Sequence, residues 1–253
     1  MNTTHPASPI DTGAENDTRL MQVQRELDGL NYAISHDLRA PLRALTGFSQ
    51  ALKEDAALPE NSSARHYLQR IEQAAQRLGV MIDGLLSLSR LSQADMHLLP
   101  VDLGAMCAEV ISEVAQQFPA HHPQVQISKP INAVCDAYLM RLALRELLHN
   151  AWKFTQDQVH PQITVETSIN RTQVTVGVRD NGIGIDMRHA DRLFVPFQHL
   201  QTRAELNGTG VGLAKVQRII HRHGGKLWIE SAPQAGATFC FSLQSVEQGI
   251  DKT

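Results

Sequence analysis

The sequence has 253 residues, a formal net charge of −3 and 42% apolar residues. This length allows one or two domains with buried cores, and this charge gives no reason to expect nucleic acid or an anionic membrane as a partner. No apolar run reaches the ~18 residues of a membrane-spanning helix, and the three cysteines have neither metal nor disulfide spacing, so we expect a cytoplasmic protein without membrane insertion.

The first part of the chain predicts two amphipathic helices. Residues 1–18 are polar and predict a disordered tail. Residues 55–64 predict a turn, and a second apolar stripe starts at Leu68. Since one hairpin buries little and two hairpins make a four-helix bundle, we predict an all-α homodimerisation domain over residues 19–91. Its first stripe, which begins as a heptad seam, consists of Leu20, Val23, Leu27, Leu30, Ile34, Leu38, Leu42, Leu45, Ser49 and Leu52.

A histidine in the first helix has an unusual setting. His36 lies in the run Ser35-His36-Asp37-Leu38-Arg39-Ala40-Pro41-Leu42, roughly opposite the apolar stripe of its helix. An exposed histidine beside an acid suits a nucleophile that is offered to a separate catalytic domain. A lone surface histidine is usually only solvated, so this residue by itself leaves both interpretations open.

Helix and strand patterns mix beyond residues 92–100, which predict a linker. Residues 101–245 predict an α+β domain with helices on one face of a sheet, and residues 246–253 predict a tail. His221 and His223 flank the end of the last helix, where a cationic ring would complement the helix dipole. The predicted helices are 103–117, 138–154 and 211–223, and the predicted strands are 125–128, 133–135, 163–169, 173–180, 226–231 and 237–243.

The helix 138–154 carries polar residues on one face. Glu146, Asn150 and Lys153 are spaced i, i+4 and i+7, so an acid, an amide and an ammonium group lie together. Such a face suits a magnesium ion and the phosphates that it carries. A solvated polar face would have the same spacing.

The strand 173–180 ends in Asp180-Asn181-Gly182-Ile183-Gly184. Asp180 falls on the same face as three valines, which predicts a partly buried carboxylate that needs a hydrogen-bond donor. The exocyclic amine of adenine would supply one, and Gly182 and Gly184 would allow close approach of the backbone. A tight turn is the equally weighted alternative.

A glycine-rich turn opens the last helix. Free amides at a helix N-terminus bind phosphate, and this turn matches neither the Walker A nor the Rossmann pattern. A flexible linker is the alternative. Thr238, after a glycine turn, is a weaker candidate for a contact near the base. The residues of the glycine-rich turn are Gly208, Thr209, Gly210, Val211, Gly212 and Leu213.

Taken in this order, the motifs resemble those of the sensor histidine kinases of two-component systems, over roughly residues 20–243. The run around His36 looks like the H box of that family, Asn150–Thr155 like its N box, and Phe194–Phe197 like its F box. Asp180–Gly184 and Gly208–Gly212 look like its two glycine boxes. The sequences of the H and N boxes most resemble those of the phytochrome-like branch.

The resemblance implies an ATP-dependent kinase with a helical phosphoacceptor domain and a sandwich of the histidine kinase, gyrase and chaperone superfamily. His36 would accept the γ-phosphoryl group, and Asp37 would orient it and help to take its proton. Asn150 would ligate Mg²⁺, with Glu146 as a candidate second-shell group, and Lys153 would contact phosphate. Phe154 would pack near the base, Asp180 would accept from the adenine amine, and residues 198–207 would form a lid.

The implied partners are a second copy of the chain, the aspartate of a response regulator and a separate input protein, unless the chain is part of a longer kinase. Ala40 stands where the commonest branch has Thr or Asn, so phosphatase activity is not expected by that route. His199 replaces a frequent arginine, which leaves an ATP-binding scaffold as an alternative. Glu146 replaces an amide, as in gyrase- and chaperone-like ATPases, which leaves an ATPase as another.

Overall fold

The computed structural model of the chain describes residues 34–35, 37–54, 63–93, 95–128, 132–170, 173–198 and 210–246. The chain divides into two compact units, Met1–Gln93 and Ala94–Thr253. The predicted N-terminal tail, the heptad seam before Ile34 and most of the C-terminal tail lie outside the described residues. Among the helices that the structure describes, none has the length and apolarity needed to span a membrane.

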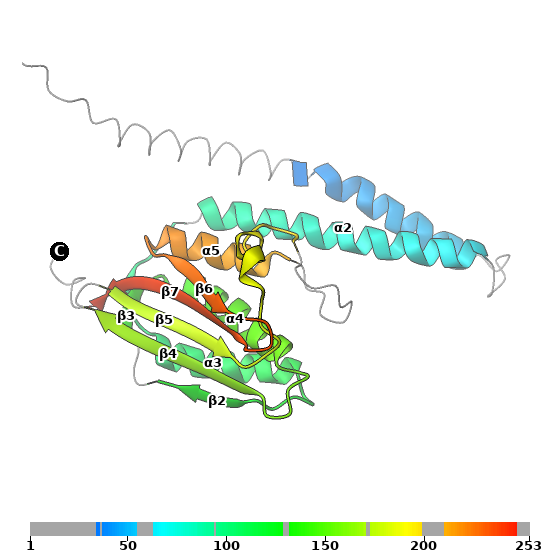
Figure 1. The fold of residues 1–253 in the computed structure, drawn as a ribbon. Helices are drawn as coiled ribbons and strands as arrows, with labels where there is room; N and C mark the ends of the chain where they lie inside the picture. The colour runs from blue at the N-terminus through cyan, green and yellow to red at the C-terminus, as the bar shows by residue number, and fades with distance from the viewer. Residues whose placement is uncertain are drawn as a thin grey trace, which may run out of the picture. The chain divides into compact units, whose positions relative to one another are not determined.

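The first unit is a helical hairpin. Residues 37–54 are helical, and α2 spans Ser63–Gln93. Arg39 Nη2 lies 2.6 Å from Asp83 Oδ1, and Lys53 Nζ lies 2.8 Å from Glu72 Oε2. Because residue numbers rise along one helix as they fall along the other, the two helices are antiparallel (Figure 1). The predicted hairpin is confirmed.

The hairpin leaves apolar side chains uncovered. Leu38, Leu45 and Leu52 repeat every seven residues and are 40%, 47% and 52% exposed. On α2, Ile71 and Leu78 are also exposed and seven residues apart. A heptad repeat is the spacing with which one helix packs against another over several turns. The apolar stripe predicted for the first helix is therefore available to a further helix pair.

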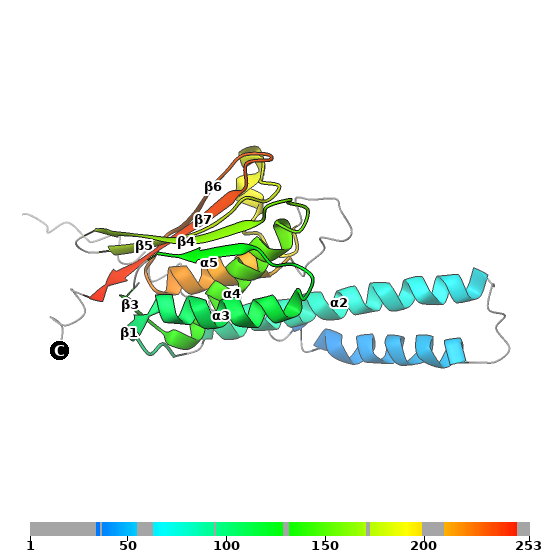
Figure 2. The ribbon, with the colours of Figure 1, turned by 90° about the horizontal axis from the view of Figure 1, so that it is seen from below.

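The second unit is a sheet with helices on one face. The strand order is β1-β3-β7-β5-β4-β2, and β6 pairs with β7. Figure 2 shows α3, α4 and α5 on the same side of the sheet, as the sequence predicted. The elements are β1 (Leu99–Asp102), α3 (Leu103–Gln117), β2 (Gln124–Ile127), β3 (Asn132–Cys135), α4 (Ala137–Phe154), β4 (Gln162–Asn170), β5 (Gln173–Asp180), η1 (Met187–Arg192), α5 (Gly212–Arg222), β6 (Leu227–Ser231) and β7 (Ala237–Ser245).

The predicted linker, residues 92–100, needs a correction at both ends. α2 continues to Gln93, and β1 begins at Leu99 and pairs antiparallel with β3. Pro100 lies within β1, although proline cannot donate a hydrogen bond to a sheet. β1 is an edge strand, however, and proline is tolerated at an edge.

The core of the second unit lies between the sheet and the helices. Val174, Val176 and Val178 alternate along β5 and are buried at 0–1% exposure. Alternation places Asp180 on the same face, toward the helices. β5 lies between β4 and β7, antiparallel to both, so its end is fixed from two sides. The fold thus holds one carboxylate at the end of a central strand.

His223, at the C-terminal end of α5, ties that helix to the start of α4. Its Nε2 accepts the backbone N–H of Asp136 at 2.9 Å, and its Nδ1 donates to the carbonyl of Ile219 at 2.8 Å. Asp136 caps α4 by accepting the N–H of Leu139, and it also accepts the N–H of His97. His223 is therefore neutral, and the expected cationic ring at this helix end is wrong for it, because its Nε2 is needed as an acceptor.

We expect this arrangement to make stability depend on pH. Burial lowers the pKa of His223, so below its ordinary value of 6.5 the unfolded chain binds a proton that the folded chain does not. The unfolding free energy should fall as pH falls below 6.5. A His223→Gln variant should lose part of this dependence in thermal unfolding between pH 5 and 8. Burial also lowers the pKa of His121 and His149, so the variant should keep the remainder.

Candidate nucleotide site

Asp180 is the buried charge of the candidate site. It is 4% exposed, and its Oδ1 accepts the backbone N–H of Gly182 at 2.8 Å. Burial raises the pKa of this carboxyl group to about 6, although backbone hydrogen bonds from Gly182 and Ala237 oppose the rise. A further donor would stabilise the charged form. The carboxylate is thus suited to a ligand that brings its own N–H group.

The turn after β5 packs against the end of α4. A Cβ atom on Gly182 would overlap the carbonyl oxygen of Phe154 and lie 2.8 Å from Asp180 Oδ1. Only glycine lets the two segments approach this closely. Gly184, farther along the turn, has a φ of 67°. The structure therefore brings together two segments that the sequence analysis singled out separately.

Lys153 and Asn150 lie on α4 and are both half-buried. The Nζ atom of Lys153 is 5.1 Å from the centroid of the Phe154 ring, a cation–π distance. Burial lowers the pKa of Lys153. An ammonium group held in partly dry surroundings gains more from an anionic ligand than one in water does.

The glycine-rich turn leads into α5. Gly210 and Val211 precede the helix, which begins at Gly212, and no side chain caps its N-terminus. The N–H of Phe197 donates to the carbonyl of Gly210 at 2.8 Å, and Phe197 has a φ of 65°. A left-handed conformation costs a non-glycine residue about 1–2 kcal/mol, so this contact is held in place by its surroundings.

Several predicted residues lie outside the part of the chain that the structure describes. These are His36, Gly208, Thr209, His199, and all but the first residue of the predicted lid, 198–207. The neighbours of His36, Ser35 and Asp37, are helical, with Ser35 buried and Asp37 exposed. Leu213 is described and lies half-buried in the first turn of α5.

The assignment of Thr238 to the site needs correction. Thr238 is opposite Arg179 in β5, whereas Ala237 is opposite Asp180. Because adjacent residues of a strand point to opposite faces, the side chain of Thr238 is on the face away from Asp180. Ala237 is the residue that the sequence analysis missed, since its N–H group binds the carboxylate of Asp180. A backbone contact leaves no signal in the side chains.

Two family models match consecutive parts of the chain. Residues 26–94 match the His Kinase A (phospho-acceptor) domain. Residues 135–247 match the histidine kinase-, DNA gyrase B- and HSP90-like ATPase domain. The first match includes His36 and Asp37. The second includes Asn150, Asp180 and Gly208–Gly212, so the residues of the candidate site fall inside the ATPase model.

Similar proteins match the chain over part of their own length. Cyanobacterial phytochrome B of Nostoc is 31% identical over 92% of this chain, which spans 31% of that protein. The methanogenesis regulatory histidine kinase FilI of Methanothrix harundinacea is 32% identical over 86% of this chain, which spans 24% of that protein. The chain thus spans less than a third of these relatives.

Solved structures share the fold. Full-length ShkA in complex with AMPPNP matches 86% of this chain and 46% of its own, with a TM-score of 0.60 and 24% identity. The Acinetobacter baumannii histidine kinase AdeS matches 83% of this chain and 98% of its own, with a TM-score of 0.57 and 20% identity. The chain matches a phosphoacceptor domain followed by an ATPase domain, and it is similar to the relatives named above. It therefore belongs to the sensor histidine kinases.

Proposed function

We propose that this chain is an ATP-dependent protein histidine kinase that phosphorylates His36 and passes the phosphoryl group to an aspartate of a response regulator. The observation that carries the proposal is the buried carboxylate of Asp180, held beside the end of α4 by Gly182. It belongs to the ATPase domain of a chain whose other domain carries the candidate acceptor. The domain limits proposed are 19–93 for the acceptor and 99–245 for the catalytic part, which shortens the linker to residues 94–98.

The described residues support specific roles in binding ATP. Asp180 would accept a hydrogen bond from the exocyclic amine of adenine, because it is buried and lacks a strong cationic partner. Lys153 would contact the phosphates, and the amides of the glycine-rich turn would bind them at the uncapped N-terminus of α5. Phosphoryl transfer depends mostly on such positioning and charge neutralisation.

The residues present fit magnesium that arrives with the nucleotide. Among the described residues, no cluster of three or more His, Cys, Asp or Glu side chains is placed to hold a metal ion. Mg²⁺ typically takes one or two protein oxygens together with substrate phosphates. Asn150 would offer its amide oxygen from the same face of α4 as Lys153. The ion would neutralise phosphate charge when bound.

His36 and Asp37 would form the acceptor. A neutral imidazole nitrogen is the nucleophile, and its bond to phosphorus forms as the bond from the γ-phosphorus to the bridging oxygen of ADP breaks. Asp37 would keep the imidazole in the reactive tautomer and take up its proton. A carboxylate oxygen of the response regulator aspartate would then bond to phosphorus as the bond from the ring nitrogen to phosphorus breaks. The ring nitrogen would take back the proton from Asp37, which restores the neutral imidazole.

The exposed heptad on the hairpin supports a homodimer. We expect Leu45→Asp to give a monomer, because a four-helix bundle would bury the new carboxylate at a cost of several kcal/mol. Light scattering after size exclusion would measure the mass. Arg43→Asp introduces the same side chain about 160° away around the helix and should remain dimeric. A Leu45→Asp protein with the mass of a dimer would contradict this assembly.

A further inference from the structure

Glu146 joins the two helices that would hold the phosphates of the nucleotide. It lies on α4, and its Oε1 is 3.3 Å from Nζ of Lys215 on α5. The exposed fractions of the two side chains are 25% and 24%, so both are largely shielded from water. The spacing of polar residues on α4 points to Glu146, whereas its partner Lys215 is brought to it only by the fold.

The carboxylate of Glu146 also touches the first turn of α5. A Cβ atom on Gly212 would lie 2.6 Å from Oε2 of Glu146. Gly212 is the first residue of α5 and the last glycine of the glycine-rich turn. A side chain at position 212 would displace the carboxylate of Glu146. Because glycine has no side chain, α4 and α5 can approach each other at this point.

The position of this pair matters for an anionic ligand. Glu146 lies one turn before Asn150 and two turns before Lys153, on the same face of α4. Lys215 lies in the first turn of α5, directly after the glycine-rich turn. An unpaired carboxylate at this point would repel a triphosphate and would compete for the positive end of the helix dipole.

We propose that Lys215 and Glu146 are a positioning pair: Lys215 neutralises the carboxylate, so that the first turn of α5 can lie against α4 with its amides toward the phosphates. This inference rests on the proposed binding of ATP. Neither residue touches the nucleotide. Because Glu146 is occupied by Lys215, it does not serve as the general base of a gyrase- or chaperone-like ATPase.

The pair can be tested by measuring the affinity for a non-hydrolysable ATP analogue with Mg²⁺ by calorimetry. Lys215→Met should weaken binding about tenfold or more, since it leaves a half-buried carboxylate unpaired near the phosphates. Glu146→Gln should change the affinity by less than about threefold. The double variant should recover most of the loss, because no unpaired charge remains.

Adenosine supplies a second measurement, because it lacks phosphates. Its affinity, followed by ligand-observed NMR, should be the same in Lys215→Met and in the unaltered protein. A double variant as weak as Lys215→Met would contradict the proposal and would mean that Lys215 binds phosphate directly. Parallel loss of adenosine binding would also contradict it, since it would indicate general damage to the site.

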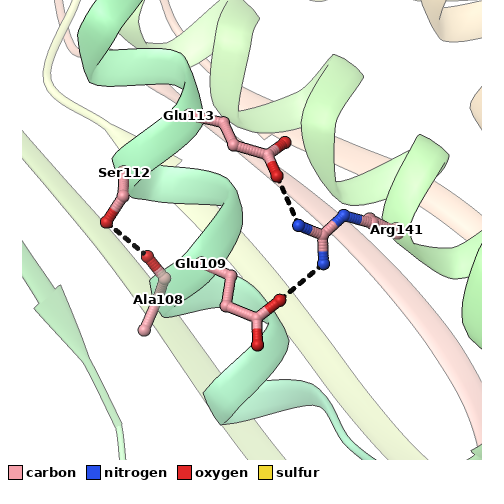
Figure 3. Close-up of polar contacts among 5 residues, drawn as sticks. All are labelled: Ala108, Glu109, Ser112, Glu113 and Arg141. Carbon is pink, nitrogen blue, oxygen red and sulfur yellow. Dashed lines mark hydrogen bonds and ion pairs between the residues drawn. The ribbon is translucent and has the colours of Figure 1, made fainter.

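Arg141 provides a matched control on the same helix. It forms ion pairs with Glu109, at 2.6 Å, and Glu113, and so links α4 to α3 rather than to α5 (Figure 3). Arg141→Met should leave the affinity for the ATP analogue unchanged, whatever it does to thermal stability. An equal loss of affinity in Arg141→Met would contradict a specific role for the Glu146–Lys215 pair.

The outcomes separate this inference from the proposed function. Failure of the unaltered protein to bind the ATP analogue would contradict the proposed function itself. If the unaltered protein and Lys215→Met bind the ATP analogue equally well, only the proposed role of the Glu146–Lys215 pair is contradicted. Phosphate release from ATP that is lost in Glu146→Gln but kept without His36 would overturn both, in favour of an ATPase.

Discussion

Replacing Asp180 with asparagine is expected to weaken the binding of ADP about 10- to 100-fold. Hydrogen bonds to a charged group contribute roughly 1.5–3 kcal/mol, and about 1.4 kcal/mol is a tenfold change in affinity. Asparagine has the shape of aspartate but presents an NH₂ group in place of one acceptor oxygen. In one of the two orientations of the asparagine amide, the adenine amine would then face the NH₂ group, which is also a donor. Calorimetry with ADP measures the change.

The same substitution is expected to leave the folded protein as stable or more stable at pH 7. Burial raises the pKa of Asp180 to about 6, against an ordinary value of 3.8. As pH rises from 3.8 to 6, the carboxyl group of Asp180 therefore ionises in the unfolded chain before it ionises in the folded one. The free energy of unfolding falls by about 3 kcal/mol over this range. Asparagine removes this cost. Lower affinity together with an equal or higher unfolding temperature indicates a residue kept for binding.

The pH dependence of binding gives an independent check. The affinity of the unaltered protein for ADP should fall as pH falls below about 6, since protonation replaces an acceptor by a donor, and this fall should be absent in Asp180→Asn. Asp186→Asn is the matched control, because Asp186 pairs with exposed Arg188. Equal affinity for ADP in Asp180→Asn and in the unaltered protein would contradict the adenine assignment.

The sequence predicted the elements well where one pattern dominates. The alternating valines of β5 gave both the strand and the inward direction of Asp180, because a period of two allows only one buried face. The helix 103–117 was predicted with its observed ends, and in the structure Asp102 caps it by accepting the N–H of Ala105. β1 was missed, because a strand that contains Pro100 depends on a place at the edge of the sheet, and local sequence does not show that place.

The parts of the site that the sequence did not predict depend on contacts between distant elements. Glu146 and Lys215, which pair across two helices, are 69 positions apart in the chain. The neutral state of His223 depends on the backbone of Asp136, 87 positions away. Thr238 was misplaced because the register between β5 and β7, which decides its face, is a property of the sheet. Local spacing carries none of this information.

Replacing His36 with glutamine is expected to abolish phosphorylation of the chain while leaving its affinity for ATP unchanged. Glutamine keeps a polar side chain of similar length but has no nucleophilic nitrogen, because its amide lone pair is delocalised. We expect a loss of labelling of more than about 100-fold, since nucleophilic transfer has no alternative acceptor in place of the ring. His66→Gln is the matched control, because His66 is an exposed histidine of the same helical unit.

The central claim is tested most directly by incubating the protein with Mg²⁺ and γ-labelled ATP, and then locating the label. We predict label that is labile in acid and stable in alkali, carried by His36, present in His66→Gln and missing from His36→Gln. Label that persists in His36→Gln, or the absence of any label in a protein that binds ATP, would contradict the account.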